Sequence, residues 1–263
     1  MNIPSQLSEF DFFLNDPFVI FEKNKFLDAN LYNQLDRTFP NVSFFESKHK
    51  LGNKLFLNNK SNTFFDFMNA NHEWNLLYKY FKKEETAIRL FELFSREISK
   101  IEERKKIQKI SIIKNYSNNL ISKFKKIYLG LSGYTSIRIG FEFSLIANNC
   151  FIPPHCDTDN KLLSLMMYFP PSDHSKDVYE NLGTNFYQTK SNAKKNFDSW
   201  HSTMLNNDET ISFNDNYEIF YKSLFSENKL VGFIKNNKSW HDASAFQNKK
   251  FWRRSININL YLV

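Results

Sequence analysis

The sequence predicts an α+β fold within a single domain that spans residues 1–263. Apolar residues recur every three or four positions through much of residues 1–130, which is the period of an amphipathic helix. From Gly133 onward the apolar residues alternate with polar ones, which is the period of a strand with one buried face. No repeat of fixed length and no low-complexity linker divides the chain. We therefore expect a mainly helical support in residues 1–130 and a β-rich core in residues 131–263.

The elements of the first half follow from their apolar spacing and from their end signals. The run Asp-Pro-Phe-Val-Ile-Phe at 16–21 indicates a short strand. Asp28 is a suitable cap for a helix that ends near Arg37, because the residue before Pro40 disfavours helical geometry. Further helices are expected at about 71–82, at about 84–100, and through the lysine-rich stretch from about 104 to about 126.

The strands of the second half are expected to enclose a polar cavity. In residues 136–145 every odd position is apolar, whereas the even positions carry Arg138, Glu142 and Ser144. Such a strand lays one face on a core and the other on a polar interior. Further strands are expected at 162–169, 184–188, 230–234 and 251–263. The polar segment at about 191–216 is expected to form a long loop or lid over the open end of the barrel.

Two distant segments together carry a set of metal ligands. His155 and Asp157 are separated by one residue, so in an extended stretch both side chains project to the same side. His241 lies near the C-terminus within Ser-Trp-His. Two imidazoles and one carboxylate can occupy one face of a metal and leave other coordination positions open, which is the ligand set of non-haem Fe(II) oxygen chemistry. The sequence therefore predicts a metal site made of His155, Asp157 and His241.

The last expected strand also has two distinct faces. Arg253, Ser255, Asn257 and Asn259 share one face, while Arg254 and the apolar residues that alternate with them share the other. The polar face should look into the interior that holds the metal site. We therefore expect Arg253 to point inward and Arg254 outward, unless a bulge exchanges the two.

Several segments together resemble the Fe(II)- and 2-oxoglutarate-dependent dioxygenase superfamily, and most nearly its bacterial branch related to prolyl hydroxylases. Residues 16–18 leading to 39–40 resemble the N-terminal strand and helix of that family. Residues 154–170 resemble its metal-binding pair of strands, 182–184 its Gly-Gly-Thr turn, and 239–241 the strand of the distal ligand. The resemblance implies a double-stranded β-helix (jelly-roll) core, with the N-terminal helices packed on its major sheet.

The resemblance also implies roles for the site residues. His155, Asp157 and His241 would bind Fe(II), and Arg253, assisted by Ser255, would pair with the distal carboxylate of 2-oxoglutarate. A guanidinium suits this task because its planar fork binds a carboxylate through two parallel hydrogen bonds. With O2 as the other cosubstrate, 2-oxoglutarate would be converted to succinate and CO2. The substrate would be hydroxylated in the same reaction.

Other side chains are candidates for contacts with 2-oxoglutarate or with substrate. Ser164 and Tyr168 share a face of the strand at 162–169, and Arg138 lies on the polar face of the strand before it. Each of these three could equally be an ordinary structural residue. Asn160 and Lys161, just after the ligand loop, are comparable candidates. The remaining histidines are expected to have no special role: His49, His72, His174 and His201.

Departures from particular branches of the family narrow the expected chemistry. Animal-type collagen prolyl hydroxylases use a lysine where Arg253 stands. Demethylases of alkylated bases carry a second arginine six residues after the first, and here that position is Asn259, so nucleic acid is not expected as a partner. Halogenases lack the carboxylate ligand, whereas Asp157 is present, so hydroxylation or desaturation is expected.

Composition places few limits on function. The net charge is +7, but the lysines are spread over many segments and are explained by solubility alone. Cys150 and Cys156 match no disulfide framework or zinc motif, and reduced thiols are expected. No apolar run approaches the roughly 20 residues of a membrane span, and no signal peptide is evident. We therefore expect a cytoplasmic protein that acts on a small molecule, with no membrane partner; the sequence gives no information on its oligomeric state.

Two other functions stay open at the level of sequence. A metal-dependent enzyme of the cupin type would bind metal without 2-oxoglutarate, and this leaves Arg253 and Ser255 unexplained. A non-catalytic jelly-roll binding module would be expected to have lost part of the ligand set. Substrate identity depends on loops, here expected at about 45–70 and 172–216, whose composition encodes no recognisable chemistry.

Overall fold

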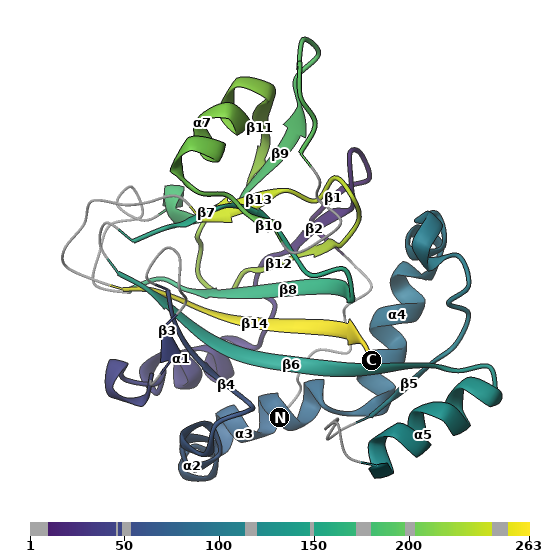
Figure 1. Ribbon diagram of the computed structural model, residues 1–263. Coiled ribbons are helices and arrows are strands. Elements are labelled where there is room, and N and C mark those ends of the chain that lie inside the picture. The colour runs from purple at the N-terminus through teal and green to yellow at the C-terminus, as the bar shows by residue number, and fades with distance from the viewer. Residues whose placement is uncertain are drawn as a thin grey trace.

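Two β-sheets face each other in the computed structural model, and helices cover the outer side of the larger sheet (Figure 1). The structure describes residues 10–45, 47–48, 54–113, 120–147, 150–171, 180–197, 203–243 and 252–263. Strand pairing is antiparallel in both sheets, apart from the parallel pair β5 and β6. This arrangement confirms the predicted α+β class with a double-stranded β-helix core.

The larger sheet contains nine strands, and β14 lies at its centre between β8 and β6. Its order is β1 (Phe12–Leu14), β2 (Ile20–Lys23), β12 (Leu230–Ile234), β8 (Lys161–Phe169), β14 (Arg253–Leu262), β6 (Thr135–Ile146), β4 (Leu55–Asn58) and β3 (Ser47–Lys48), with β5 (Ile110–Ile112) also paired to β6. The smaller sheet has the order β10 (Thr203–Met204), β7 (Ile152–Cys156), β13 (His241–Ala243), β9 (Asn185–Thr189) and β11 (Tyr217–Lys222).

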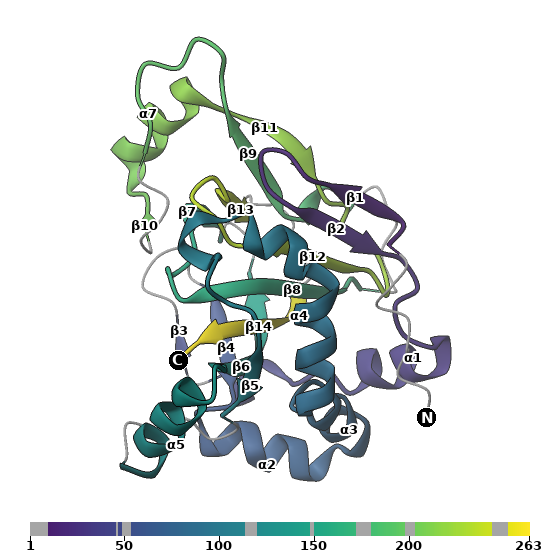
Figure 2. The ribbon, with the colours of Figure 1, turned by 90° about the vertical axis from the view of Figure 1, so that its right-hand side faces the viewer.

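The helices of the first half lie on the side of the larger sheet that faces away from the smaller sheet (Figures 1 and 2). The helices are α1 (Ala29–Arg37), α2 (Asn62–Ala70), α3 (His72–Phe81), α4 (Glu84–Ser99), α5 (Leu120–Leu131) and α7 (Asn207–Asn216). Short 3-10 turns occupy Val42–Phe44, Glu102–Arg104 and Glu180–Leu182. Of these helices, α7 lies apart from the others, beside the smaller sheet.

An aromatic core joins the helices to the larger sheet. The odd positions of β6 from Ile137 to Leu145 are buried, as their alternation predicted, and Phe143 among them is fully buried. Its ring meets that of Trp74 from α3 edge to face at 4.7 Å, and Phe169 of β8 lies 5.4 Å from the same indole. Trp74 also donates a hydrogen bond from Nε1 to the carbonyl of Thr38 at 3.1 Å. Burial of such large aromatic side chains is a main source of folding free energy, so this layer supports the sheet on whose other face the cavity lies.

Most elements expected from the sequence are confirmed. Asp28 caps α1, because its carboxylate accepts hydrogen bonds from the backbone N–H groups of Asn30 and Leu31. Helices α3 and α4 begin and end within about one residue of the expected positions. The strands β6, β8, β9, β12 and β14 also lie where the alternation placed them, except that residue 251 is outside the described part. The expected strand at 16–21 is displaced, because β2 runs from Ile20 to Lys23.

The expected helix from about 104 to about 126 is wrong. Ile110 and Ile112 belong to β5, which pairs in parallel with β6, and α5 begins only at Leu120. Both isoleucines are buried while Ser111 between them is only partly so, and this is a strand alternation three residues long. Such a short alternation is easily hidden within a helical spacing, and the tertiary pairing with β6 decides the conformation.

Two segments expected as loops contain regular structure. The interval 45–70 holds β4 and α2, and Ser61 caps α2 by accepting a hydrogen bond from the backbone N–H of Phe64 at 3.1 Å. The described part of 191–216 holds α7, whose capping box joins Asn206 and Glu209 in reciprocal hydrogen bonds. Both caps are local signals, but the polar composition of the segments obscured them.

Helix α5 presents large apolar side chains to solvent. These residues recur along one stripe of the helix: Leu120, Ile121, Phe124, Ile127, Tyr128 and Leu131. The lysines of this stretch were expected to form the solvent-facing side of an amphipathic helix, and both faces are in fact exposed. In the described part of the chain, no helix has the length and apolar character required to cross a membrane.

A matched pair of glycine substitutions tests the packing of the larger sheet. In β12, a Cβ at Gly232 would overlap the ring of the fully buried Phe21, whereas a Cβ at Gly130 in α5 meets no atom within 4 Å. We expect Gly232→Ala to lower the free energy of unfolding by about 1–3 kcal/mol through overpacking. Gly130→Ala should leave it unchanged or raise it by up to about 1 kcal/mol, since alanine favours a helix. Urea denaturation of both variants measures this, and equal effects would contradict the packing described.

Candidate metal centre

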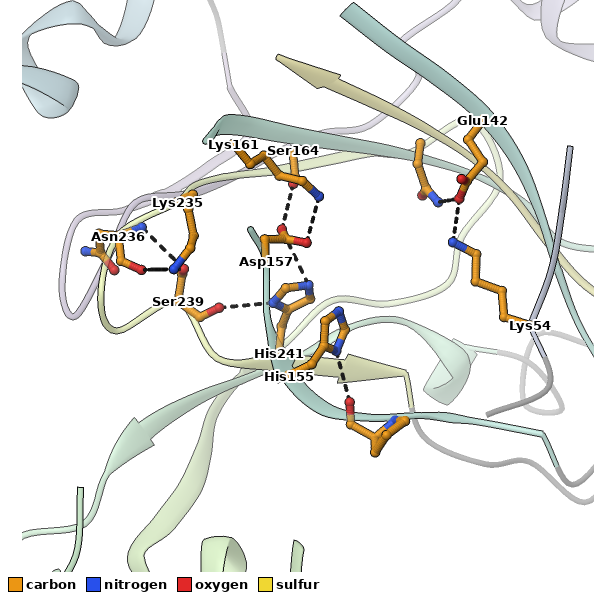
Figure 3. A network of polar contacts seen from close by, with 12 residues as sticks. Lys54, Glu142, His155, Asp157, Lys161, Ser164, Lys235, Asn236, Ser239 and His241 are labelled. Atoms are coloured by element: carbon orange, nitrogen blue, oxygen red, sulfur yellow. Dashed lines mark hydrogen bonds and ion pairs between the residues drawn. The ribbon is translucent and has the colours of Figure 1, made fainter. Parts of the chain in front are cut away.

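The three predicted metal ligands come together where β7 and β13 pair. His155 lies in β7, Asp157 follows that strand directly, and His241 opens β13. The two strands are antiparallel with His241 opposite His155, and one ligand atom from each of the three residues lies within 4.8 Å of the others (Figure 3). Cys156, between the first two ligands, belongs instead to the buried apolar cluster that includes Trp240. The alternation along β7 therefore directs both ligands to the same side.

Hydrogen bonds to backbone carbonyls orient the two imidazoles. Nδ1 of His155 lies 2.9 Å from the carbonyl oxygen of Pro153, and Nδ1 of His241 lies 3.0 Å from that of Ser239. A carbonyl oxygen can only accept, so each Nδ1 carries the proton and each Nε2 presents its lone pair. Burial, together with the neighbouring His241, lowers the pKa of His155 to about 3, and burial also lowers the pKa of His241. Both rings are therefore neutral at physiological pH, which is the form that binds a metal.

The carboxylate of Asp157 is held by two side chains of β8. Lys161 Nζ lies 2.7 Å from Oδ1, and Ser164 donates a hydrogen bond from Oγ to Oδ2 at 3.1 Å. Burial by itself would raise the pKa of Asp157, but the positive charge of Lys161 and the two histidines outweigh it and hold the pKa below its usual value. The donor set is thus two neutral imidazoles and one ionised carboxylate. This set fits a divalent first-row metal bound on one face, with other positions left for further ligands.

A cavity of about 500 Å³ opens in front of these ligands, between the two sheets. The inward face of β14 forms one wall, and the strands β6 and β8 on either side of it contribute further side chains. The residues of β14 that line the cavity are Arg253, Ser255, Asn257, Asn259 and Tyr261. The predicted division of β14 into an inward polar face and an outward apolar face is therefore confirmed.

One end of the cavity is formed by a buried guanidinium. Arg253 is 4% exposed, its Cζ lies 5.3 Å from the ring centres of Tyr168 and Phe225, and its Nε donates a hydrogen bond to the carbonyl of Leu182. No carboxylate of a described residue forms an ion pair with it. A buried cation without a counterion is costly, so this end of the cavity favours an anionic group. Arg254 points to the other side of the sheet and pairs with Asp36 at 2.7 Å.

The other candidates lie at different places around the cavity. Ser164 lines it beside Asp157, and Ser255 lines it beside Arg253 along β14. Tyr168 does not line it: its ring packs against Arg253, and its hydroxyl hydrogen-bonds to the side-chain oxygens of Thr184 and Ser223, each at 2.9 Å. Arg138 lines the cavity and stacks on the ring of Tyr261, with 4.1 Å from Cζ to the ring centre.

Two features of the site had no counterpart among the sequence predictions. Lys54, just before β4, reaches the cavity and pairs with Glu142 of β6 at 2.5 Å. No local signal marks Lys54, because its segment was expected to be a loop. Asp242, beside the ligand His241, accepts a hydrogen bond from Asn185 at 2.7 Å and another from the hydroxyl of Tyr187. In the sequence, the only indication of a role for Asp242 was its place directly after His241.

Of the remaining histidines, only His72 is within the described residues, where it begins α3. His49, His174 and His201 lie outside them. Within the described residues, the group of His155, Asp157 and His241 is the one set of three that could hold a metal ion.

Comparison with known proteins gives structural matches alone. No family model matches the chain, and no curated protein matches it in sequence. A prolyl-4-hydroxylase from Pseudomonas putida matches with 10% identity, 94% of this chain and 92% of that chain covered, and a TM-score of 0.41. HygX from Streptomyces hygroscopicus, with nickel, 2-oxoglutarate and hygromycin B bound, matches with 6% identity, 94% and 84% covered, and a TM-score of 0.44.

A prolyl hydroxylase from Trichoplax adhaerens, in complex with a fragment of the hypoxia inducible factor oxygen degradation domain, gives a similar result. Its identity is 9%, its TM-score is 0.42, and the match covers 92% of this chain and 83% of that chain.

Asp242 makes the stability of the metal-free protein depend on pH. Burial raises its pKa to about 6, although the hydrogen bonds from Tyr187 and Asn185 oppose this. Since an unfolded aspartate has a pKa of about 3.9, the folded state binds more protons than the unfolded state between about pH 4 and pH 6, and its stability falls as pH rises through this window. We expect Asp242→Asn to remove up to about 3 kcal/mol of this decline.

Urea denaturation at several pH values, with a chelator present, measures the effect. Asp66→Asn is a matched control, because Asp66 lies on the exposed side of α2 and should keep the wild-type slope. The same slope in Asp242→Asn and wild type would contradict the assignment.

Proposed function

We propose that this chain is an Fe(II)- and 2-oxoglutarate-dependent oxygenase that hydroxylates a small metabolite, a sugar derivative or an amino-acid side chain. The observation that carries this proposal is a pairing of two features within one cavity. His155, Asp157 and His241 form a candidate metal ligand set on one wall. The buried guanidinium of Arg253, which has no carboxylate partner among the described residues, forms one end. A metal ligand set and an anion site so arranged suit a cosubstrate that has a chelating group at one end and a carboxylate at the other.

Fe(II) would be held by Nε2 of both histidines and by a carboxylate oxygen of Asp157. When bound together with 2-oxoglutarate and O2, the metal supplies oxidation of a substrate C–H bond, coupled to the conversion of 2-oxoglutarate to succinate and CO2. The chain's own contribution is orientation. The carbonyls of Pro153 and Ser239 set the histidine tautomers, while Lys161 and Ser164 hold the carboxylate. Partners of this kind strengthen metal binding because they pre-organise the ligands.

Arg253 would bind the distal carboxylate of 2-oxoglutarate, with Ser255 beside it. The guanidinium is held in place by the carbonyl of Leu182 and by the rings of Tyr168 and Phe225, so little conformational freedom is lost on binding. Apolar side chains border the metal ligands on this side, and the ring of Phe233 packs 4.6 Å from that of His241. Such surroundings exclude water and strengthen the electrostatic interactions of the bound cosubstrate.

Two alternative functions give different expectations. A metal-dependent enzyme of the cupin type would not consume 2-oxoglutarate, and the buried charge of Arg253 would then have no anionic ligand to bind. A non-catalytic binding module would bind metal or ligand without turnover. The proposal therefore stands on the consumption of 2-oxoglutarate, which neither alternative shares.

Purified protein with Fe(II), ascorbate and air should form succinate from 2-oxoglutarate slowly in the absence of substrate. Asp157→Ala should abolish this turnover, because the variant loses one of three metal ligands and the charge that partners Lys161. Succinate is quantified directly, and metal content is measured beside it. If wild type neither forms succinate nor binds 2-oxoglutarate in the presence of Mn(II), the oxygenase proposal fails.

The two neighbouring arginines of β14 offer a matched test of cosubstrate binding. We expect Arg253→Gln to raise the KM for 2-oxoglutarate by about 10- to 150-fold, the loss expected when a charged hydrogen-bonding partner is removed. Arg254→Gln should lower thermal stability, because it breaks the ion pair with Asp36, but should leave that KM unchanged. Equal KM values for Arg253→Gln and wild type would contradict the role of Arg253.

A further inference from the structure

The part of the cavity away from Arg253 is lined by charged and amide side chains. The strand pairing of the larger sheet locates this part of the cavity, because β14 runs from Arg253 at one end of the cavity to Tyr261 at the other. Asn259 lies opposite Ser164, which hydrogen-bonds to the metal ligand Asp157. Tyr261 lies opposite Lys161, which pairs with the same carboxylate, so both of these rows border the metal ligands. Tyr261 lies two residues further along β14, which corresponds to about 7 Å.

Arg138 occupies this outer row, because β6 places it directly opposite Tyr261. Its guanidinium lies on the ring of Tyr261, and the position of that ring depends on Gly140, since a Cβ there would come within 2.9 Å of the ring. A cation stacked on an aromatic face keeps its in-plane N–H groups available for a ligand. The stack thus holds Arg138 in a defined direction at the cavity wall.

Besides Arg138, two described cationic side chains line the outer cavity, and both form ion pairs with carboxylates. Lys161 pairs with Asp157 at 2.7 Å, and Lys54 pairs with Glu142 at 2.5 Å. Within the described residues, Arg138 forms neither an ion pair nor a side-chain hydrogen bond. Of the charged side chains that the structure describes around the outer cavity, Arg138 is therefore the one whose charge is not balanced by an ion pair. An anionic group entering the cavity beyond the metal ligands has this guanidinium as its available partner.

Two amide side chains follow Tyr261 along the cavity face of β14 toward Arg253, first Asn259 and then Asn257. Asn257 donates a hydrogen bond to Glu142 at 3.3 Å, and the amide of Asn259 makes none with a described residue. Amide groups that face a cavity provide donors and acceptors for hydroxyl, amide or amine groups of a ligand. The same cavity, of about 500 Å³, must also hold 2-oxoglutarate, and the space left within it fits a small molecule.

We propose that the substrate is a small polar metabolite with a carboxylate or phosphate group, and that Arg138 binds this group. Asn259, and beyond it Asn257, contact the polar body of the substrate, and the carbon to be oxidised lies in front of the metal ligands. The proposal rests on the oxygenase function and adds its substrate class. It assigns Arg138 to the substrate and Arg253 to 2-oxoglutarate, so each of the two guanidinium groups, at opposite ends of the cavity, binds a different anionic ligand.

The test compares probes that differ only in an anionic group. Binding to protein loaded with Mn(II) and 2-oxoglutarate is measured by calorimetry for gluconate against sorbitol, and for glycerol phosphate against glycerol. The first pair reports a carboxylate and the second a phosphate. Wild type should bind at least one anionic probe about 10- to 100-fold more tightly than its neutral partner, the preference expected of a charge-assisted hydrogen-bonded pair.

Variants locate the source of that preference. Arg138→Gln should remove it, and Arg138→Lys should restore only part of it, because an ammonium lacks the planar fork. Arg96→Gln is the matched control: it removes the same charge from the exposed side of α4 and should keep the wild-type preference. The proposal is overturned if neither anionic probe binds at millimolar concentration, if neutral and anionic probes bind equally, or if the preference survives in Arg138→Gln. It is also overturned if Arg138→Gln weakens 2-oxoglutarate binding as much as it weakens probe binding.

Failure of the oxygenase function gives a different result. If wild type does not bind 2-oxoglutarate in the presence of Mn(II), the oxygenase proposal fails, and the probe titrations are repeated without 2-oxoglutarate. A preference for an anionic probe that is lost in Arg138→Gln but kept in Arg253→Gln still supports Arg138 as an anion site. Loss of the preference in Arg253→Gln alone overturns that assignment.

Discussion

The backbone pairing that holds β14 between β6 and β8 determines the geometry of the whole site. Side chains alternate along a strand, so this pairing directs the polar side chains of β14 into the cavity and its apolar side chains into the aromatic core. A shift of one residue would exchange the two rows, placing Arg254 in the cavity and Arg253 among the helices. The burial of residues such as Phe143 on the far side makes that shift very unfavourable. The hydrophobic layer thereby stabilises the register on which the polar site depends.

The charges of the cavity follow one principle, which is that a buried charge needs a partner. Asp157 pairs with Lys161, and Glu142 pairs with Lys54. Each pair joins two of the segments that form the walls of the cavity. The guanidinium of Arg253 has no carboxylate partner among the described residues. A buried guanidinium without an ion pair to any described residue thus lies at one end of a cavity that has a candidate metal ligand set on its wall, which is a physical reason to expect an anionic ligand there.

Several parts of the site could be predicted from the sequence because they depend on local spacing. The separation of His155 and Asp157 by one residue places both ligands on one side of an extended segment, and the alternation near the C-terminus separates Arg253 from Arg254. Helix α1 was predictable in the same way, since Asp28 caps it. Short or interrupted signals were not sufficient. The alternation in β5 spans three residues, and the capping box of α7 lies within a segment whose polar composition is typical of a loop.

The sequence by itself determined the candidate set of metal ligands, the α+β class and the face of β14 on which each residue lies. These properties depend on residue type and on the period of a strand or helix, which are local. Only the tertiary structure decided which distant residues share the cavity: the pairing of Lys54 with Glu142, the place of Tyr261 on Arg138, and the contact of Lys161 with Asp157. These contacts depend on the register between strands that are far apart in the chain, and that register is decided by how well the whole core packs.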